Sequence, residues 1–355
     1  MRTVNLVIGG LATALRLFFS LFVGAIGVFG PQAISKADPI TDLRSLSVFK
    51  HADLRKLANG GVLASKGPAM SFARGLSVES AYIVRAPVKT TLALQERWNP
   101  TSHPDLKVYA QADISGRGNP GDFQGLASVR SNSSIKAFVG ATLRLPGDAS
   151  KVQLSGAEAK MFSPGGSSEG AIPASVVAFW SKVLAERAQS FAYGGLGGEA
   201  PYDTSGSPVR AEQEVSQLIR ESGNVRSYFS SLISSTPIGG GRGSPPTSQS
   251  WQMFDADGIA SVSLSASYGK PVGDGWQSAD LLYYASGGVY AVVTFYQMWP
   301  VKVDNRDATL VWQIDMTSAA EIGGLRGIER LASGAAMMRE IQRSVKAFLR
   351  DTSRG

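Results

Sequence analysis

The side chains that could perform chemistry in this chain are mostly hydroxyls and carboxylates. The 355 residues include no cysteine and only two histidines, His51 and His103. Disulfides, thiolate zinc sites, iron–sulfur clusters and cysteine nucleophiles are therefore excluded. The histidines lie about fifty positions apart, and neither has a carboxylate at ligand spacing beside it. We expect no metal, no cofactor and no histidine-based catalysis, with His51 in a solvent-side or capping position.

Three short motifs match known chemistry only in part. Gly195 to Ala200 fits the loose G-x-G-x-x-A pattern of dinucleotide binding, but it follows a predicted helix instead of a strand. Asp255 to Gly258 begins like a calcium loop, but Ile259 stands where an oxygen ligand is required. Ser47 to Lys50 and Ser133 to Lys136 match S-x-x-K without the companion S-D-N and K-T-G elements. We predict a loop and a turn from the first two motifs, and the catalytic residues stay unknown.

Aromatic side chains are the remaining candidates for a functional site. Several fall on predicted strands, where rings most often belong to the core. The alternative is a cavity in which one or two hydroxyls orient an apolar ligand. The six candidates for such a ligand-binding site are Tyr82, Tyr268, Tyr284, Tyr290, Tyr296 and Trp312.

Strands must position these aromatic residues, and the clearest strand pattern lies in the carboxyl-terminal third. Ile259 to Tyr268 alternates apolar residues with serines at a period of two. Turn-forming residues separate it from the runs that follow, and such short loops predict an antiparallel meander. The predicted strands are 76–85, 106–113, 259–268, 277–285, 289–299 and 308–316.

A long amphipathic helix is predicted after the meander, from Ala319 to Arg350. Its apolar stripe needs a partner, and the sheet is the large apolar surface that precedes it. The fold class is therefore α+β, with a curved antiparallel sheet that grips a carboxyl-terminal helix. Residues 38–355 form a single domain with a helical insertion at about 164–248. The other predicted segments are helices at 42–58, 88–98, 172–193 and 209–233 and a flexible linker at 234–250.

The amino terminus has the pattern of an export signal. An uncharged apolar block at 17–29 follows a basic-ended segment, and Ser35-Lys36-Ala37 is a small-x-small cleavage site. Residues 1–37 are therefore predicted to be a signal peptide that is cut after Ala37. The alternative is an uncleaved anchor over 4–29, which Arg16 interrupts. The cleaved chain is expected to be periplasmic or secreted, with no membrane span.

Net charge does not indicate nucleic-acid binding. The full chain has a formal charge of +7. Residues 1–37 carry three basic residues and no acidic residue, so 32 basic and 28 acidic residues remain after cleavage. No run rich in Lys and Arg is left in the body of the chain, and we expect no nucleic-acid partner.

Four parts of the chain carry a resemblance to a known family: Leu76 to Pro87, Arg144 to Asp148 followed by Val152 to Leu154, Tyr202 to Phe229, and Tyr283 to Ser286. With these parts and the order of its elements, the chain resembles the helix-grip fold of the START-like (SRPBCC) superfamily, and within it a group of exported bacterial proteins. The resemblance implies a cavity under the long helix for lipids, sterols or other hydrophobic molecules, and it carries over no catalytic residue. Members of the group have cysteines beside a P-G-D turn, where this chain has Arg144 and Ala149.

These observations favour an exported soluble protein that binds or carries a hydrophobic small molecule. One alternative is a cofactor-free hydrolase or cyclase on the same scaffold, with tyrosines and an acid such as Glu79 or Asp280. A deeply buried polar residue with a shifted pKa would favour this enzyme. The other alternative is a structural or interaction protein of the envelope whose helical insert docks a partner. Contiguous exposed apolar area on the insert would favour that role.

Overall fold

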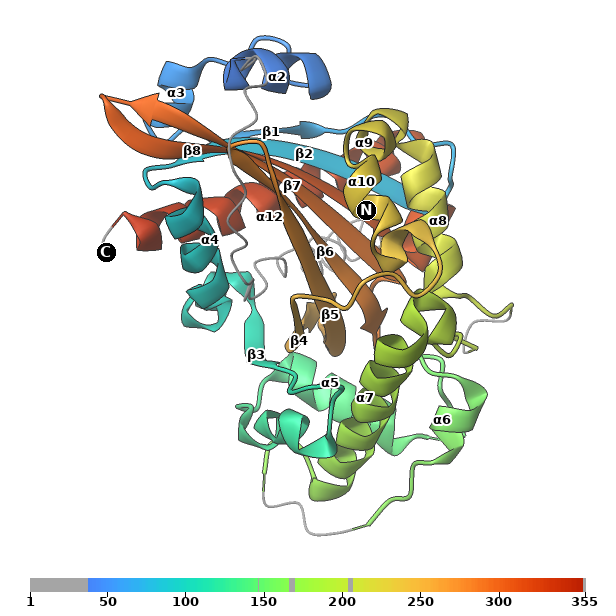
Figure 1. Ribbon diagram of the computed structural model, residues 1–355. Coiled ribbons are helices and arrows are strands. Elements are labelled where there is room, and N and C mark those ends of the chain that lie inside the picture. Colours follow the sequence, from blue (N-terminus) through green and yellow to red (C-terminus); the bar gives the residue numbers. More distant parts are fainter. Residues whose placement is uncertain (1–37, 146, 166–169, 204–206, 354–355) are drawn as a thin grey trace.

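One antiparallel sheet organises the chain. The computed structural model describes residues 38–145, 147–165, 170–203 and 207–353. Within them, eight strands pair in the order β1-β2-β8-β7-β6-β5-β4-β3 (Figure 1). The predicted signal peptide, residues 1–37, lies outside the described residues. No described helix combines the length and the apolar character that a membrane span requires.

The strands occupy most of the positions that alternation predicts. The β5 strand carries Ala260, Val262, Leu264, Ala266 and Tyr268 on one face and serines on the other, because successive side chains of a strand point to opposite sides. The strands are β1 (Leu63–Lys66), β2 (Gly75–Val84), β3 (Val108–Asp113), β4 (Ser248–Ala256), β5 (Ile259–Val272), β6 (Gly275–Ala285), β7 (Ala291–Val303) and β8 (Arg306–Ser318).

Helices cover both faces of the sheet and give two buried cores (Figure 1). The larger core lies on the face that we call the helical-layer face. It is covered by α2 (Pro39–Leu46), α3 (Leu54–Ala58), α5 (Ser133–Leu143), α6 (Gly156–Lys160), α7 (Ala174–Gly194), α8 (Ala211–Glu221), α9 (Gly223–Tyr228) and α10 (Ser230–Ser234).

The opposite face, which we call the α12 face, carries the smaller core. It is covered by α4 (Val88–Arg97), α11 (Ala320–Gly324) and α12 (Gly327–Thr352). Met337, Ile341, Val345 and Phe348 of α12 belong to this core together with Val78 and Val84 of β2, and α12 packs mainly on β1 and β2. The α+β class, the antiparallel sheet and its carboxyl-terminal helix are therefore as predicted.

Three predicted helices are each divided in the structure. The segment 209–233 forms α8, α9 and α10. The segment 42–58 forms α2 and α3, because Ser47 makes its own turn by donating to the Leu43 carbonyl and accepting from the Phe49 amide, at 2.5 and 3.0 Å. The segment 319–350 forms α11 and α12, since the chain is extended at Leu325 and Arg326 before Gly327 takes a positive φ of 47°. The single long helices were wrong at these points.

The predicted linker 234–250 was too long at both ends. The α10 helix runs to Ser234, and Pro237–Gly239 form a 3₁₀ turn. From Ser248 the chain is already strand β4, which pairs with β3 and β5. Residues 240–247 carry no helix or strand.

Candidate functional site

The six aromatic residues predicted to bind a ligand do not share one site. Tyr268, Tyr284, Tyr290 and Trp312 belong to the core of the helical-layer face, whereas Tyr82 and Tyr296 belong to the core of the α12 face. All six side chains are buried. A cavity between the sheet and α12 can therefore involve only Tyr82 and Tyr296 of this set.

Most of the aromatic residues on the helical-layer face have structural partners. The Trp312 indole N–H donates to Glu79 at 2.9 Å, and the Tyr284 hydroxyl donates to the Gln153 carbonyl at 3.0 Å. Burial raises the pKa of Glu79, although its hydrogen bonds from the Val48 amide and Trp312 oppose that rise. Glu79, one of the two acids considered for catalysis, thus fastens the segment after α2 to the sheet.

Polar side chains form a patch on the central strands of the α12 face. Strand register places Ser267, Asp280, Thr294 and Asp315 in one row across β5, β6, β7 and β8. The next row holds Ser278, Tyr296, Gln313 and Ser80 across β6, β7, β8 and β2. Tyr82 lies two residues beyond Ser80 on the same face. We call these nine residues the inner polar patch.

The two carboxylates of the inner polar patch accept hydrogen bonds within the sheet. Ser267 donates to Asp280 at 2.6 Å, and Thr294 donates to Asp315 at 2.9 Å. The Gln313 amide donates to both oxygens of Asp315, at 3.1 and 2.9 Å. Asp280, the other acid considered for catalysis, therefore lies in the same row as a second buried acid.

Burial dominates the electrostatics of this patch. It raises the pKa of Asp315 to about 7, helped by the nearby charge of Asp280 and opposed by the hydrogen bonds from Gln313 and Thr294. Burial likewise raises the pKa of Tyr82 and Tyr296, so both hydroxyls are neutral donors. Asp315 is thus a group that exchanges a proton near neutral pH.

On β2 and β8, four buried polar atoms of the α12 face have no hydrogen-bond partner among the described residues. They are the hydroxyl oxygens of Ser80, Tyr82 and Thr317 and the Oε1 atom of Gln313. Ser80 and Gln313 are direct cross-strand neighbours, so the unpaired atoms gather on β2 and β8. Such groups are rare in folded proteins, because each one loses its hydrogen bonds to water on burial.

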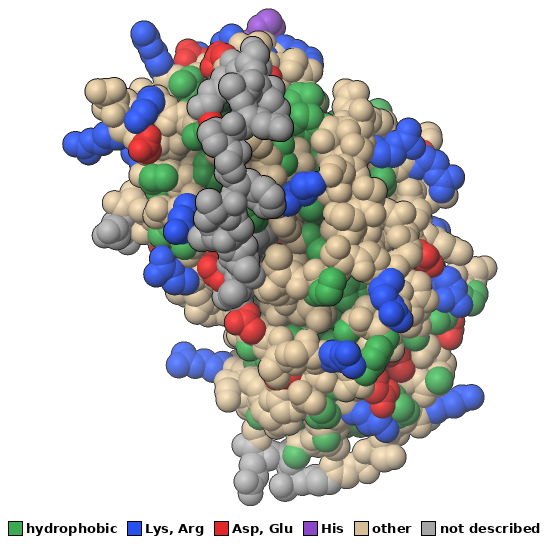
Figure 2. Space-filling model, in the orientation of Figure 1, with side chains coloured by type: hydrophobic (Ala, Val, Ile, Leu, Met, Phe, Trp, Pro, Cys, Tyr) green, Lys and Arg blue, Asp and Glu red, His purple; other side chains and the backbone are tan. Residues whose placement is uncertain are grey.

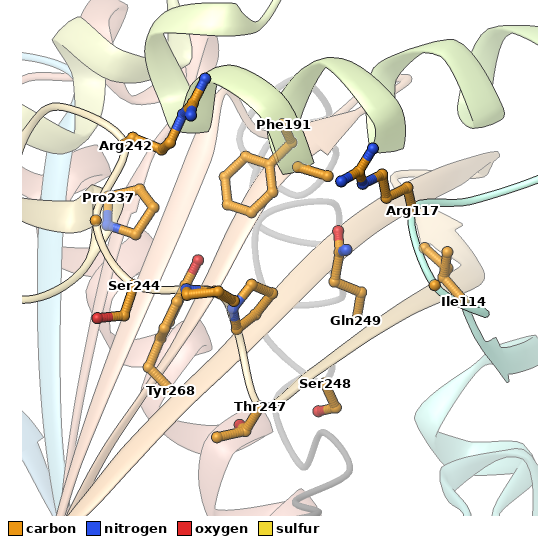
Figure 3. Close-up of a pocket in the computed structure, with 15 residues that line it drawn as sticks. Ile114, Arg117, Phe191, Pro237, Arg242, Ser244, Thr247, Ser248, Gln249 and Tyr268 are labelled. Carbon is orange, nitrogen blue, oxygen red and sulfur yellow. The ribbon is translucent and has the colours of Figure 1, made fainter.

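A separate pocket opens on the helical-layer side, where Tyr268 contributes to its lining (Figure 3). Its volume is about 450 Å³, and Phe191 of α7 and Pro237 form part of its wall. Figure 3 shows Arg117 and Arg242 on either side of the space between Phe191 and the sheet. Of the six predicted ligand-binding residues, Tyr268 alone lines this pocket.

The sequence did not predict several residues of the inner polar patch and of the pocket in Figure 3. Along β7 and β8, Thr294, Gln313 and Asp315 alternate with apolar residues at a period of two. Strand alternation could therefore have placed these three polar residues on one face of the sheet. Arg117 and Arg242 lie outside helices and strands, where no periodic pattern exists to find them.

A buried ion-pair cluster lies under α7 and is structural. Arg187 donates to Glu158 at 2.7 Å and to Glu199 at 3.2 Å, and its guanidinium lies 4.1 Å from the centre of the Tyr284 ring. All three charged side chains are buried. Burial raises the pKa of Glu199 to about 8, against the effect of Arg187.

The motifs set aside in the sequence occupy ordinary structural positions. Gly195–Gly198 form a 3₁₀ turn after α7, and Asp257 and Gly258, both with positive φ, turn the chain from β4 into β5. His51 is exposed, and His103 pairs with Asp351 of α12 at 2.7 Å. Among the described residues, no group of three or more His, Asp or Glu side chains could hold a metal ion.

Surface charge is mixed on the face drawn in Figure 2. Lys and Arg side chains are scattered there among Asp and Glu side chains. Arg85 with Asp304 and Lys302 with Asp307 are exposed ion pairs of the described chain. Comparisons of the chain with protein-family models, with curated proteins and with solved structures found no match.

Proposed function

We propose that the protein binds and carries a hydrophobic small molecule that bears at least one hydroxyl group. The ligand would lie against the α12 face of the sheet, as in a helix-grip protein of the START-like superfamily. The single observation that supports this proposal is the group of three unpaired polar atoms, those of Ser80, Tyr82 and Gln313, at neighbouring positions of β2 and β8.

Energetics favour an occupant for this cluster. Each unpaired buried group destabilises the fold by about 1–3 kcal/mol, so three neighbouring ones represent a substantial penalty in the absence of a partner. A ligand hydroxyl would donate to Gln313 Oε1 and accept from Tyr82 or Ser80, and so relieve this penalty on binding.

The surroundings of the cluster fit an apolar ligand body. Val78, Val84, Val311, Met298 and Phe348 are buried on the same face. These side chains offer no hydrogen bonds, so the polar atoms would set the orientation of the ligand while apolar contact would supply most of the affinity.

The proposal also includes export of the protein from the cytoplasm. The mature chain would begin at Asp38 after cleavage behind Ala37 and would act in the periplasm or outside the cell. Its support is the basic, apolar and small-residue order of residues 1–37.

The test uses the full-length chain, produced in an exporting bacterial host and purified for native mass spectrometry and solvent extraction. We expect an amino terminus at Asp38 and a co-purifying apolar molecule that carries a hydroxyl. The double variant Ser80→Ala/Tyr82→Phe removes two unpaired hydroxyls, so it should fold normally and lose most of the ligand. A chain that is free of ligand under all conditions would contradict the proposal.

Ser181→Ala is the matched control for this experiment. Ser181 of α7 is also buried with an unpaired hydroxyl, but it belongs to the helical layer. The control should retain the ligand in the amount found with the natural sequence. Equal loss of ligand from the control and the double variant would remove the support for binding at β2 and β8.

A cofactor-free hydrolase or cyclase is the second candidate. The observation in its favour is Asp315, an acid whose pKa of about 7 suits proton transfer at neutral pH, in the same row as Asp280. An enzyme of this kind would lose turnover of its extracted ligand on substitution Asp315→Asn, whereas a carrier would keep its binding.

The envelope interaction role has less support. Among the described residues of the insert, Tyr193 is the only large hydrophobic side chain that is exposed, and the Arg117 guanidinium lies 4.5 Å from the centre of its ring. The described insert therefore lacks the contiguous apolar surface that this role requires.

A further inference from the structure

The pocket of Figure 3 is distinct from the α12 face and is built entirely from described residues. It lies where the carboxyl end of α7 meets β4 and β5. Apolar groups form much of its wall, and the flanking loops supply its polar groups. The lining residues that matter for the argument are Ile114, Phe191 and Pro237 for the wall and Arg117, Arg242, Gln249 and Tyr268 for the polar groups.

Tyr268 provides an unpaired donor at the pocket. Its side chain is 2% exposed, and its hydroxyl has no hydrogen-bond partner. Burial raises the pKa of this hydroxyl, which therefore keeps its proton. Nearby, the Gln249 Oε1 atom accepts from the Tyr283 hydroxyl at 3.0 Å, so the Gln249 amide nitrogen is left as a donor.

Two guanidinium groups add positive charge to the pocket. Arg117 donates to the Tyr193 hydroxyl at 2.5 Å and stacks on that ring, which holds the guanidinium at the rim. No carboxylate lines the pocket, and neither Arg117 nor Arg242 forms an ion pair with a described carboxylate. Arg117, Arg242, Gln249 and Tyr268 can thus all donate to a ligand, and two of these four groups are charged.

Two glycines hold Arg242 in position. Gly195 has a φ of +61°, and a Cβ there would lie 2.7 Å from the Gly241 carbonyl oxygen. Gly243 also has a φ of +61°, and its Cβ would lie 2.5 Å from the Pro237 nitrogen. The segment that carries Arg242 therefore packs closely on the end of α7 and on its own 3₁₀ turn.

We propose that this pocket binds a small organic anion with a flat apolar body, such as an aromatic carboxylate or sulfonate. The body would lie against Phe191, Pro237 and Ile114, and the anionic group would accept from Arg117 and Arg242. Tyr268 and Gln249 would donate to further oxygen atoms of the ligand. A volume of about 450 Å³ is in the range of pockets that hold molecules of this size.

The test compares two fluorescent probes that differ mainly in charge. 8-Anilinonaphthalene-1-sulfonate is an aromatic anion, and N-phenyl-1-naphthylamine is its uncharged counterpart. Arg117→Gln/Arg242→Gln should weaken binding of the anion by about tenfold or more, because charge-assisted hydrogen bonds are lost, and should change binding of the neutral probe less than about twofold. Arg220→Gln/Arg339→Gln, with the same charge change on exposed residues of α8 and α12, should leave both affinities unchanged.

Tyr268→Phe tests the floor of the pocket without a folding penalty. Its hydroxyl has no partner to lose, so the melting temperature should stay equal or rise while affinity for the anionic probe falls about threefold or more. 2-Naphthoate should displace the anionic probe, and inorganic phosphate alone should not.

Three results would overturn the proposal. The first is unchanged anion binding in Arg117→Gln/Arg242→Gln, and the second is equal weakening in the Arg220→Gln/Arg339→Gln control. The third is displacement by phosphate as readily as by 2-naphthoate, which would indicate a bare-anion site without an apolar subsite. None of these results depends on a ligand at the α12 face.

Discussion

Asp315 on the α12 face combines hydrogen bonds that favour its charged form with burial that disfavours it. Asp315 is completely buried, yet its neighbours Thr294 and Gln313 donate to it as if to a carboxylate. Burial still dominates and raises its pKa from 3.8 to about 7. A residue selected for stability alone would avoid this conflict, so Asp315 is consistent with a functional demand on the patch.

This raised pKa makes stability depend on pH in a defined direction. Between about pH 4 and pH 7 the folded chain holds a proton on Asp315 that the unfolded chain has released, so the free energy of unfolding falls as the pH rises. The loss approaches about 4 kcal/mol at most for a shift of this size. Asp315→Asn mimics the protonated acid and should be increasingly more stable than the natural chain as the pH rises.

Urea unfolding at about pH 5 and about pH 8 measures this effect. Asp307→Asn is the control, because Asp307 lies on the same strand but is exposed and paired with Lys302. We expect the control to track the natural chain at both values within about 0.5 kcal/mol. A constant difference between Asp315→Asn and the natural chain at both values would contradict the raised pKa.

Sequence reasoning at this scale assigned faces better than it assigned sites. Alternation correctly grouped Tyr82 with Val78 and Val84, and Tyr268 with Leu264. It failed on β6, where a register shift after the Leu264–Tyr284 pair places Tyr283 and Tyr284 in the same core. A period of two also does not say which face of the sheet binds a ligand. The six aromatic candidates are therefore divided between the two faces of the sheet.

The predicted secondary structure agrees with the structure where the hydrophobic periodicity is strong. It is wrong where a strand has the amino-acid composition of a loop. β4 begins in the polar stretch 248–250, where Ser248 and Ser250 face the α12 side beside the serines of β5 and Gln249 faces the helical layer. Pairing with β3 and β5 overrides the weak strand propensity of these residues. The helix α5 was missed because it begins within a run of turn-forming residues, 131–134.

The geometry at the end of α7 depends on one residue, Gly195. Gly195 adopts a φ of +61° and lets the Gly241 carbonyl approach its Cα closely. Gly195→Ala should therefore destabilise the fold by roughly 1–3 kcal/mol, through backbone strain and through displacement of the 237–247 segment. Thermal unfolding measures the loss.

Gly194→Ala is a matched control at the neighbouring position. Gly194 has a φ of −119°, and a Cβ there would have no atom within 4 Å. We expect this substitution to be neutral or slightly stabilising, since alanine favours the helix end. Equal destabilisation by both substitutions would show that the close approach of Gly241 is not the cause.

At the scale of the whole molecule, the insert is part of the core instead of an appendage. Phe191 of α7 stacks on Tyr283 of β6 with ring centres 3.8 Å apart, and Phe229, directly after α9, lies 4.8 Å from Phe295 of β7. The sequence predicted helices in this region but not the surface they cover, because the apolar residues of a helix do not specify the partner on which they pack. The apolar surface on which these helices pack forms only when the eight strands pair in their observed order.

This shared core predicts that the insert and the sheet unfold together. Phe229 is fully buried and contacts Phe295 and Trp312 of the central strands. Phe229→Ala should destabilise the protein by about 3–5 kcal/mol, because it leaves a cavity between the two layers. Hydrogen exchange should then show the same loss of protection in α7 and in β5 to β7.

The exposed Leu331 of α12 supplies the control, since Leu331→Ala should change stability by less than about 1 kcal/mol. Loss of protection confined to 174–234 would mean that the helical layer is an independent unit, and the single-domain arrangement would have to be abandoned.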